Sequence, residues 1–152
     1  MKNWITFLGT GFWVGYTPLA PGTMGTLVGV GLYLVFRRIL PHPLSYAIMI
    51  VVFTGLGVWI SGKCEGYSEK KDSKVIVIDE IDGFLITMFA LPFSFRFILL
   101  GFILFRVFDI LKPLKIERIQ KLPGGWGIMG DDIAAGVLAS IVLHISCSMF
   151  RW

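Results

Sequence analysis

Long apolar stretches, broken only by short polar turns, constrain this chain more than any other feature of its sequence. Hydrophobic residues make up 55% of the 152 residues, and charged residues only 16%, against roughly 25% in an average soluble domain. A soluble protein of this length could not cover so much apolar surface, so lipid must solvate part of it. The sequence therefore predicts an integral membrane protein, with one membrane-embedded domain over residues 1–152.

The apolar stretches also give an expected number of membrane spans. A helix needs about 20 residues to cross about 30 Å of hydrocarbon, and four stretches qualify: 22–40, 44–62, 75–111 and 132–150. The third is too long for one span, and Pro92 disfavours helix at the residue before it. We therefore expect a helical hairpin there, at about 77–91 and 95–111. The fold class that follows is all-α, a polytopic membrane helix bundle of about five transmembrane helices.

The basic residues support this number and orient the chain. With five spans and the N-terminus inside, ten basic residues fall on the cytoplasmic side and four outside, as the positive-inside rule requires. The inner ones are Lys2, Lys63, Lys70, Lys71, Lys74, Arg106, Lys112, Lys115, Arg118 and Lys121, and the outer ones are Arg37, Arg38, Arg96 and Arg151. A four-span topology would divide the basic residues of 63–76 and 106–131 between the two faces.

The five-span topology brings four polar segments to one membrane face. The segments 17–26 (TPLAPGTMGT), 79–83 (DEIDG), 108–113 (FDILKP) and 124–132 (GGWGIMGDD) all fall on the cytoplasmic side. Ionisable groups at membrane depth are costly and usually functional. We therefore expect these segments to form one cytoplasmic-face site. The most polar stretch, 62–74, is expected to be a solvated loop.

Several function classes receive no support. The net charge of +4 is modest and its basic residues lie in turns, which argues against a nucleic-acid partner. Cys64 and Cys147 are isolated, and His42 and His144 have no second ligand at metal spacing, so none is expected to be catalytic. The N-terminal apolar run is too short for a cleaved signal peptide.

Paired carboxylates are the strongest chemical signal. Asp79 and Glu80 are adjacent at the expected start of one helix, and Asp131 and Asp132 at the start of the last. Helix N-termini favour carboxylates, so capping could explain one residue of each pair. It does not explain two at both places, whereas Mg²⁺ takes such oxygen ligands and keeps waters to bind phosphate. Asp82 is a single acid that we expect only to solvate a helix end.

A row of charges at 106–112 is the second signal. The spacing of three and three places Arg106, Asp109 and Lys112 on one face of a helix that Pro113 ends. The three could form a structural ion-pair ladder, which contributes little if exposed. Alternatively, they present a carboxylate to a metal and an ammonium to phosphate, which is the interpretation we favour.

Two glycine-containing segments could receive phosphate oxygens. Gly125 and Gly127 precede Asp131 and allow backbone amides to face an anion. Gly22 and Thr23 follow Pro18 and Pro21 at the start of the first long helix. Alone, the first pattern is a weak signal, and an ordinary Pro-Gly turn with a Thr cap would explain the second.

The four polar blocks together resemble a known family, the bacterial phosphatidylglycerophosphatase A family. TPLAPGTMGT, VIDEIDGF, FRVFDILKP and GGWGIMGDDIAAG are similar to its signature blocks in order and spacing, and with the spans between them they cover nearly the whole chain. The resemblance implies a Mg²⁺-dependent enzyme of the bacterial inner membrane. Such an enzyme dephosphorylates phosphatidylglycerophosphate to phosphatidylglycerol, so the expected partners are this lipid and the bilayer.

The resemblance also implies a set of site residues. The expected catalytic residues are Asp79, Glu80, Asp109, Lys112, Asp131 and Asp132. The five acids among them are also the expected metal ligands. The residues expected to bind the substrate are Gly22, Thr23, Arg106, Gly125 and Gly127. Asp82 departs from the family pattern, where a small apolar residue is expected, and its role stays open.

Two alternatives remain at this stage. The substrate could be another lipid phosphate, because no residue above reads the headgroup beyond its phosphate. In a different class, a small transporter could use the acids to bind a cation, although such acids commonly lie near the bilayer midplane beside broken helices. The sequence leaves the oligomeric state, the number of metal ions and the nucleophile open.

Overall fold

The computed structural model describes residues 2–67 and 75–150, and this part of the chain contains helices and no strand. The α-helices are α1 (Lys2–Gly9), α2 (Pro21–Ile39), α3 (Pro43–Tyr67), α4 (Ile78–Thr87), α5 (Phe95–Leu111) and α6 (Gly125–Phe150). Two 3₁₀ segments, η1 (Val14–Tyr16) and η2 (Pro113–Lys121), lie between them. The prediction of an all-α fold is confirmed.

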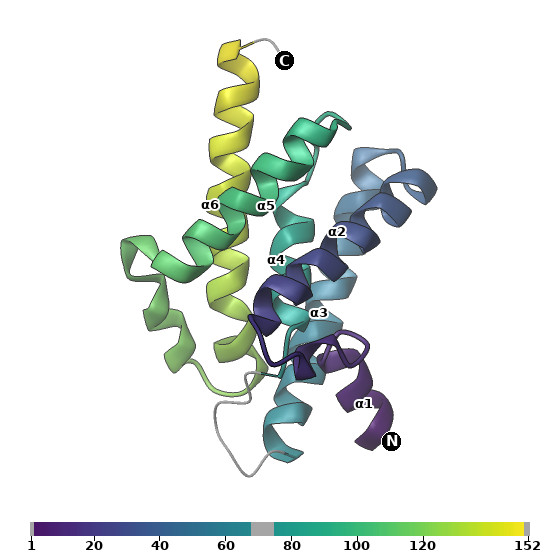
Figure 1. The fold of residues 1–152 in the computed structure, drawn as a ribbon, viewed down its shortest axis with the longest axis vertical. Helices are drawn as coiled ribbons and strands as arrows, with labels where there is room; N and C mark the ends of the chain where they lie inside the picture. The colour runs from purple at the N-terminus through teal and green to yellow at the C-terminus, as the bar shows by residue number, and fades with distance from the viewer. Residues whose placement is uncertain (1, 68–74, 151–152) are drawn as a thin grey trace.

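Helix α4 is the centre of the bundle. It packs against α2, α3, α5 and α6, most extensively against α6 and α2 (Figure 1). Most of its residues are buried, including Ile81, Phe84 and Leu85, and so is Val77 just before it. With ten residues it is about 15 Å long, half of the hydrocarbon thickness. The expected helix at 77–91 is therefore shorter than predicted, and α4 cannot cross a bilayer by itself.

Glycines allow α2 and α6 to approach α4 closely. In α2, Gly25 lies against Val77 and Gly29 against the backbone of Ile81. In α6, Gly136 lies against the carbonyl of Gly83. A Cβ at any of these glycines would crowd the neighbouring helix, so small residues here set the helix separation, as in many membrane bundles.

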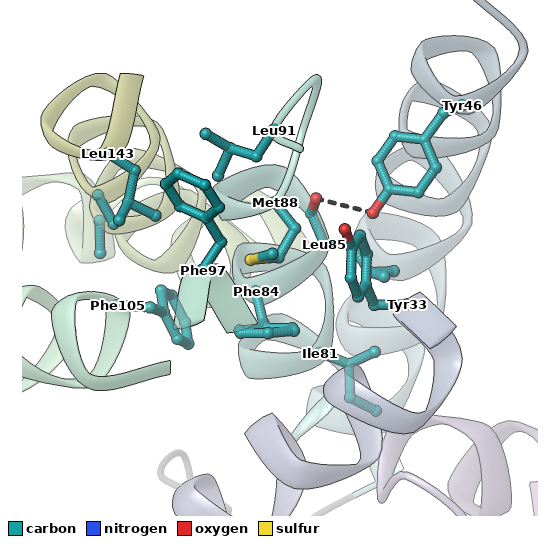
Figure 2. Close-up of a cluster of buried hydrophobic side chains, with 12 residues drawn as sticks. Tyr33, Tyr46, Ile81, Phe84, Leu85, Met88, Leu91, Phe97, Phe105 and Leu143 are labelled. Carbon is teal, nitrogen blue, oxygen red and sulfur yellow. Dashed lines mark hydrogen bonds between the residues drawn. The ribbon is translucent and has the colours of Figure 1, made fainter. Parts of the chain in front are cut away.

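The main apolar core surrounds the far half of α4. Phe84, Leu85 and Met88 pack with Phe97 and Phe105 of α5 and with residues of α2, α3 and α6 (Figure 2). The buried hydroxyl of Tyr46 donates a hydrogen bond to the carbonyl of Leu85 (3.0 Å), near the end of α4. This hydrogen bond satisfies the Tyr46 hydroxyl, whereas the buried hydroxyl of Tyr33 in the same core has no partner among the described residues.

Helix α5 has the bounds that the sequence predicts. Residues 88–94, which include Pro92, form turns and irregular backbone between α4 and α5. The Ser94 hydroxyl then caps α5 by accepting a hydrogen bond from the backbone N–H of Arg96. The predicted break at Pro92 is confirmed.

Helix α6 begins at Gly125, seven residues earlier than the expected start at 132. Gly124 adopts a left-handed conformation (φ 61°), and the helix follows directly. Asp131 and Asp132 therefore lie within the helix rather than at its start. The physical reason is packing: a Cβ on Gly125 would overlap the Val58 carbonyl of α3, so this glycine permits a close helix contact instead of a loop.

Among the described residues, two helices are long and apolar enough to cross a membrane by length and composition: Pro43–Gly66 and Gly125–Met149. Helix α3 extends beyond the expected span and covers part of the predicted polar loop, up to Tyr67. The rest of that loop, 68–74, lies outside the described residues.

Candidate active site

Five helix ends or near-ends surround a single cavity of about 590 Å³. The start of α2 contributes Gly22, the end of α3 contributes Glu65, and the start of α4 contributes Asp79 and Glu80. The end of α5, η2 and the first turns of α6 complete the lining with Arg106, Asp109, Lys112, Gln120, Gly127, Asp131 and Asp132. Residues of all four polar blocks meet here, so the predicted convergence of these segments is confirmed.

The α4 acids lie in the first turn of their helix, as the sequence predicts. The backbone amides and dipole at this helix end favour their negative charge. Capping is nevertheless incomplete, because Val77 at the N-cap makes no side-chain cap. Asp79 Oδ1 and Glu80 Oε2 are buried and receive no hydrogen bond from any described residue. The two carboxylates therefore keep oxygens available for another partner.

The α6 acids are the most deeply buried of the cavity. Asp131 is 4% exposed and Asp132 3%. Since α6 begins at Gly125, neither acid caps its N-terminus, which removes the alternative explanation for this pair. Asp131 Oδ2 accepts hydrogen bonds from Lys112 and from the Gln120 amide (2.7 Å). Asp132 Oδ2 has no such partner within the part of the chain described.

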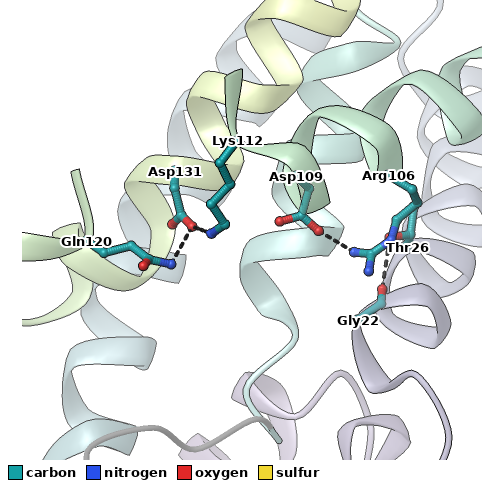
Figure 3. A network of polar contacts seen from close by, with 7 residues as sticks. All are labelled: Gly22, Thr26, Arg106, Asp109, Lys112, Gln120 and Asp131. Atoms are coloured by element: carbon teal, nitrogen blue, oxygen red, sulfur yellow. Dashed lines mark hydrogen bonds and ion pairs between the residues drawn. The ribbon is translucent and has the colours of Figure 1, made fainter. Parts of the chain in front are cut away.

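The charges of the α5 end pair differently from the predicted ladder. Arg106 forms an ion pair with Asp109, one turn away, at 2.5 Å. Lys112 is not in the helix but at its C-cap, in a left-handed conformation (φ 46°), and its ammonium reaches Asp131 of α6. Figure 3 shows the resulting row of Gln120, Asp131, Lys112, Asp109 and Arg106. Both cations thus face the cavity beside carboxylates.

Burial and neighbouring acids act in opposite directions on Lys112. Burial alone would lower the pKa of its ammonium. The hydrogen bond and charge of Asp131, with the charges of Asp132 and Asp109, outweigh burial and raise the pKa. Lys112 is therefore a fixed positive charge at neutral pH.

The predicted substrate residues divide into two groups. Gly22 lines the cavity so closely to the Arg106 guanidinium and the Glu80 carboxylate that a Cβ would overlap them, and Gly127 and Arg106 also line it. Thr23 and Gly125 do not line it. Gly125 serves helix packing, as described above, and Thr23 is half-buried in the first turn of α2.

Asp82 is placed differently from the prediction. It is fully buried rather than solvated, and its Oδ2 accepts a hydrogen bond from the Thr54 hydroxyl of α3 at 2.7 Å. The reason is that α3 covers this side of α4, a contact that the local sequence does not reveal. Asp82 lies outside the cavity lining.

Two polar cavity residues were missed by sequence reasoning, Glu65 and Gln120. Glu65 lies in the polar stretch interpreted as a loop, but it falls on the last turns of α3. Gln120 is in η2, whose left-handed residues Leu114 and Lys115 turn the chain back toward α6. No local pattern marks either residue.

Comparison with known proteins decides the family. A sequence model described as phosphatidylglycerophosphatase A matches residues 7–147, nearly the whole chain. The chain belongs to this family.

Named relatives agree with the phosphatidylglycerophosphatase A assignment over most of their length. The chain is 34% identical to phosphatidylglycerophosphatase A of Escherichia coli over 146 residues, covering 95% of this chain and 84% of the relative. It is 38% identical to the protein of the same name from Haemophilus influenzae over 145 residues (94% and 88%). A Bacteroides thetaiotaomicron relative, 36% identical over 151 residues (95% and 92%), carries the provisional name of a phosphatidylinositol-3-phosphatase. No solved structure matches the chain.

Membership of a lipid phosphatase family, together with the two membrane-capable helices, makes the chain a membrane protein. The cavity also fits the divalent cation that such a phosphatase would use. Two trios of acids place one carboxylate oxygen each within 4.8 Å of one another: Asp79, Glu80 and Asp132, and Asp109, Asp131 and Asp132. Every acid of the first trio has a buried oxygen without a partner among the described residues. Oxygen-rich sites of this kind suit hard cations.

Proposed function

We propose that this chain hydrolyses the phosphomonoester of phosphatidylglycerophosphate to phosphatidylglycerol and inorganic phosphate. The observation that carries the proposal is the cavity in which five carboxylates, three of them with a buried oxygen that lacks a partner among the described residues, meet Arg106 and Lys112. The chain that forms this cavity belongs to the phosphatidylglycerophosphatase A family. In the reaction a water oxygen bonds to phosphorus, the bond from phosphorus to the glycerol oxygen breaks, and that oxygen takes a proton.

Mg²⁺ is the cofactor that we propose, held by Asp79, Glu80, Asp109, Asp131 and Asp132. When bound, it would neutralise phosphate charge and lower the pKa of a bound water. Lys112 would stabilise the charge on the phosphoryl oxygens, since it is preorganised by Asp131 and partly buried. Arg106, beside Gly22, would bind a phosphate oxygen at the start of α2. A carboxylate of the cluster would orient the water and accept its proton.

The location that we propose is the cytoplasmic face of the bacterial inner membrane, in a multi-pass topology of about five helical segments. The direction of the helices supports it: α2, α4 and α6 start at or near the cavity, whereas α3 and α5 end there. Successive segments therefore run in alternating directions, with α4 and α5 forming one short hairpin. The bias of basic residues toward the cavity side gives the orientation.

Aromatic side chains near the cavity end support an interfacial location. Trp4, Phe12, Trp13 and Tyr16 are exposed, and rings of this cluster contact one another. The segment is tied to the start of α4 by a hydrogen bond from the Val77 N–H to the Gly9 carbonyl (2.9 Å). Tryptophan and tyrosine favour the headgroup region of a bilayer, so this cluster would place the carboxylates at the depth of a lipid phosphate.

The B. thetaiotaomicron relative supports a second candidate substrate, phosphatidylinositol 3-phosphate. Both lipids present a phosphomonoester, and the charged residues of the cavity would recognise only that group. The experiment is phosphate release by the purified protein in detergent, supplied with phosphatidylglycerophosphate, phosphatidic acid or phosphatidylinositol 3-phosphate. Assays are run with excess EDTA and after Mg²⁺ is restored.

We expect the highest kcat/KM for phosphatidylglycerophosphate, no turnover in EDTA, recovery with Mg²⁺ and little effect of thiol reagents. A higher kcat/KM for phosphatidylinositol 3-phosphate would identify that lipid, in place of phosphatidylglycerophosphate, as the substrate. Cation binding without phosphate release from any of the lipids would instead favour a cation transporter. Full turnover in EDTA would remove the metal from the mechanism.

A further inference from the structure

The two acidic trios of the cavity share one residue but differ in what surrounds them. Asp132 belongs to both; Asp79 and Glu80 complete one trio, and Asp109 and Asp131 the other. Only 3% of Asp132 is exposed, and its Oδ2 has no hydrogen-bond partner among the described residues. A carboxylate has two oxygens, so one side chain in this position can serve two ions.

The first trio forms no ion pair within the described part of the chain, although the Arg106 guanidinium lies near Glu80. Asp79 Oδ1, Glu80 Oε2 and Asp132 Oδ2 are all buried and accept no hydrogen bond from the described part of the chain. An uncompensated buried charge is strongly unfavourable. A divalent cation among these three oxygens would remove that penalty, so this trio is expected to bind an ion tightly.

The second trio is already occupied by side-chain cations. Asp109 Oδ2 pairs with Arg106 at 2.5 Å, and Asp131 Oδ2 accepts from Lys112 and Gln120. A metal ion here must compete with the ammonium of Lys112. The second trio is therefore expected to bind an ion more weakly than the first.

The charge of the cavity favours more than one ion once a phosphate enters. The described side chains that line the cavity include six carboxylates, counting Glu65, and two cations, Arg106 and Lys112, which leaves a formal charge of −4. A phosphate monoester adds about −1.5 to −2. With a single divalent ion the loaded cavity would still carry about −4, and with two ions about −2.

We infer that the cavity holds two divalent cations bridged by Asp132, one bound tightly by Asp79 and Glu80 and one bound weakly by Asp109 and Asp131. The second ion binds when a phosphate draws the Lys112 ammonium away from Asp131 and frees that carboxylate. Lys112 thus couples arrival of the substrate to completion of the metal centre. This two-ion centre rests on the proposed function, because it concerns the metal site proposed there.

The test uses Mn²⁺ as the probe, with binding stoichiometry and electron paramagnetic resonance measured on the full chain in detergent. Wild-type protein should bind one Mn²⁺ per chain with an isolated-ion spectrum. Added inorganic phosphate should bring in a second ion and an exchange-coupled spectrum, because ions in two-metal phosphatase sites lie about 3.5–4 Å apart. Asp131→Asn should keep the first ion and lose the second.

Lys112→Gln gives the sharpest outcome, because it should impair catalysis yet improve binding of the second ion. Removing a charged hydrogen-bond donor from Asp131 should lower the Mn²⁺ concentration for half-saturation of the weak site by about tenfold or more without phosphate. Lys115→Gln, an exposed change in η2 outside the cavity, should leave both sites unchanged. Melting temperatures on the same samples establish that each variant is folded.

One Mn²⁺ per chain in every folded variant, with or without phosphate, would overturn the inference and leave Asp109 and Asp131 as holders of Arg106 and Lys112. A second ion in wild type but no gain in Lys112→Gln would overturn the proposed competition. These results are independent of the proposed function: Mg²⁺-dependent turnover with one ion refutes only the two-ion centre. Two bound ions without turnover of phosphatidylglycerophosphate refute only the function.

Discussion

At the scale of single residues, the buried acids of the bundle differ in the partners of their carboxylate oxygens. Asp131 faces Lys112 and Gln120, whereas Asp132, one residue later, has an oxygen without a partner. Asp82 is fully buried like them, but it lies outside the cavity against Thr54 of α3. A buried carboxyl is therefore not by itself a sign of catalysis in this protein, and the cavity lining decides which acids can meet a substrate.

Asp82 and Thr54 provide a stability prediction. Among the described residues, Thr54 makes the one hydrogen bond to the Asp82 carboxylate. Thr54→Val removes it, so we expect a loss of about 1–3 kcal/mol in unfolding free energy. Thr54→Ser keeps the hydroxyl and should lose less. Asp82→Leu combined with Thr54→Val removes both polar groups and should recover part of the loss. Thermal unfolding in detergent measures all three, and equal melting temperatures for Thr54→Val and Thr54→Ser would contradict the contact.

The place of the pairs Asp79–Glu80 and Asp131–Asp132 at a common cavity was predictable, because adjacent acids beside apolar helices are unusual and costly. The buried position of Asp82 was not, because it depends on which helix covers α4. Gln120 and Glu65 were missed for the same reason. Their place at the cavity follows from the fold of η2 and the length of α3, not from their neighbours in sequence.

At the scale of elements, α4 owes its central position to the small residues of its neighbours. Gly136 of α6 lies against the Gly83 carbonyl, and Gly29 of α2 lies against Ile81. These contacts hold the first turn of α4, with Asp79 and Glu80, against the acids of α6. Packing of the bundle and geometry of the cavity are thus linked through the same helix.

Alanine substitutions of two glycines test this packing. Gly136→Ala would place a Cβ against the Gly83 backbone, so we expect lower thermal stability and a loss of activity through displacement of α4. Gly31→Ala is the matched control, since no atom lies within 4 Å of the added Cβ and alanine favours a helix by about 0.5–1 kcal/mol over glycine. A melting temperature of Gly136→Ala equal to that of Gly31→Ala would mean that the α4–α6 contact is not this close.

Element boundaries were predictable where proline or a capping residue marks them. Pro92, Ser94 and Pro113 fix α5 between its two turns, and its bounds agree with the expectation. The start of α6 was not predictable, because glycine in sequence indicates a turn as readily as a close helix contact. Only the neighbouring carbonyl of Val58 explains why Gly125 is helical.

At the scale of the whole molecule, the alternating direction of the helices brings distant segments to one end. Residues near 22, 65, 79, 112 and 131 line the same cavity although they come from five different helical segments and their connections. Figure 1 shows α1 and the end of α6 toward opposite ends of the long axis. The apolar stretches and the bias of basic residues were sufficient to predict this convergence, whereas the shortness of α4 was not predicted.

Cysteine-accessibility labelling in intact cells tests the topology. In a background with Cys64→Ser and Cys147→Ser, we expect Lys63→Cys and Glu117→Cys to react only after the membrane is permeabilised, since both are exposed near the cavity end. His42→Cys and Phe93→Cys, exposed in connections at the opposite ends of α3 and α5, should react from outside. Labelling of Lys63→Cys and Glu117→Cys from opposite sides would contradict a single cytoplasmic-face site.

The cluster of cavity acids should behave as one catalytic unit. Substitutions that keep shape but remove charge should each lower kcat by about 10²-fold or more, with combined losses that are not additive. They are Asp79→Asn, Glu80→Gln, Asp109→Asn, Asp131→Asn and Asp132→Asn. Lys112→Ala should lose a similar factor, because a preorganised positive charge is removed. Asp82→Asn should lose much less, because Asp82 does not line the cavity.

Phosphate release from phosphatidylglycerophosphate by the Asp132→Asn variant, measured per folded protein with Mg²⁺ present, tests the central role of these acids most directly. We expect turnover at least about 10²-fold below wild type. The melting temperature of the metal-free variant should be equal to or above that of wild type, because an unpartnered buried charge has been removed. Turnover near the wild-type rate in the folded Asp132→Asn variant would contradict the assignment of this cavity as the active site.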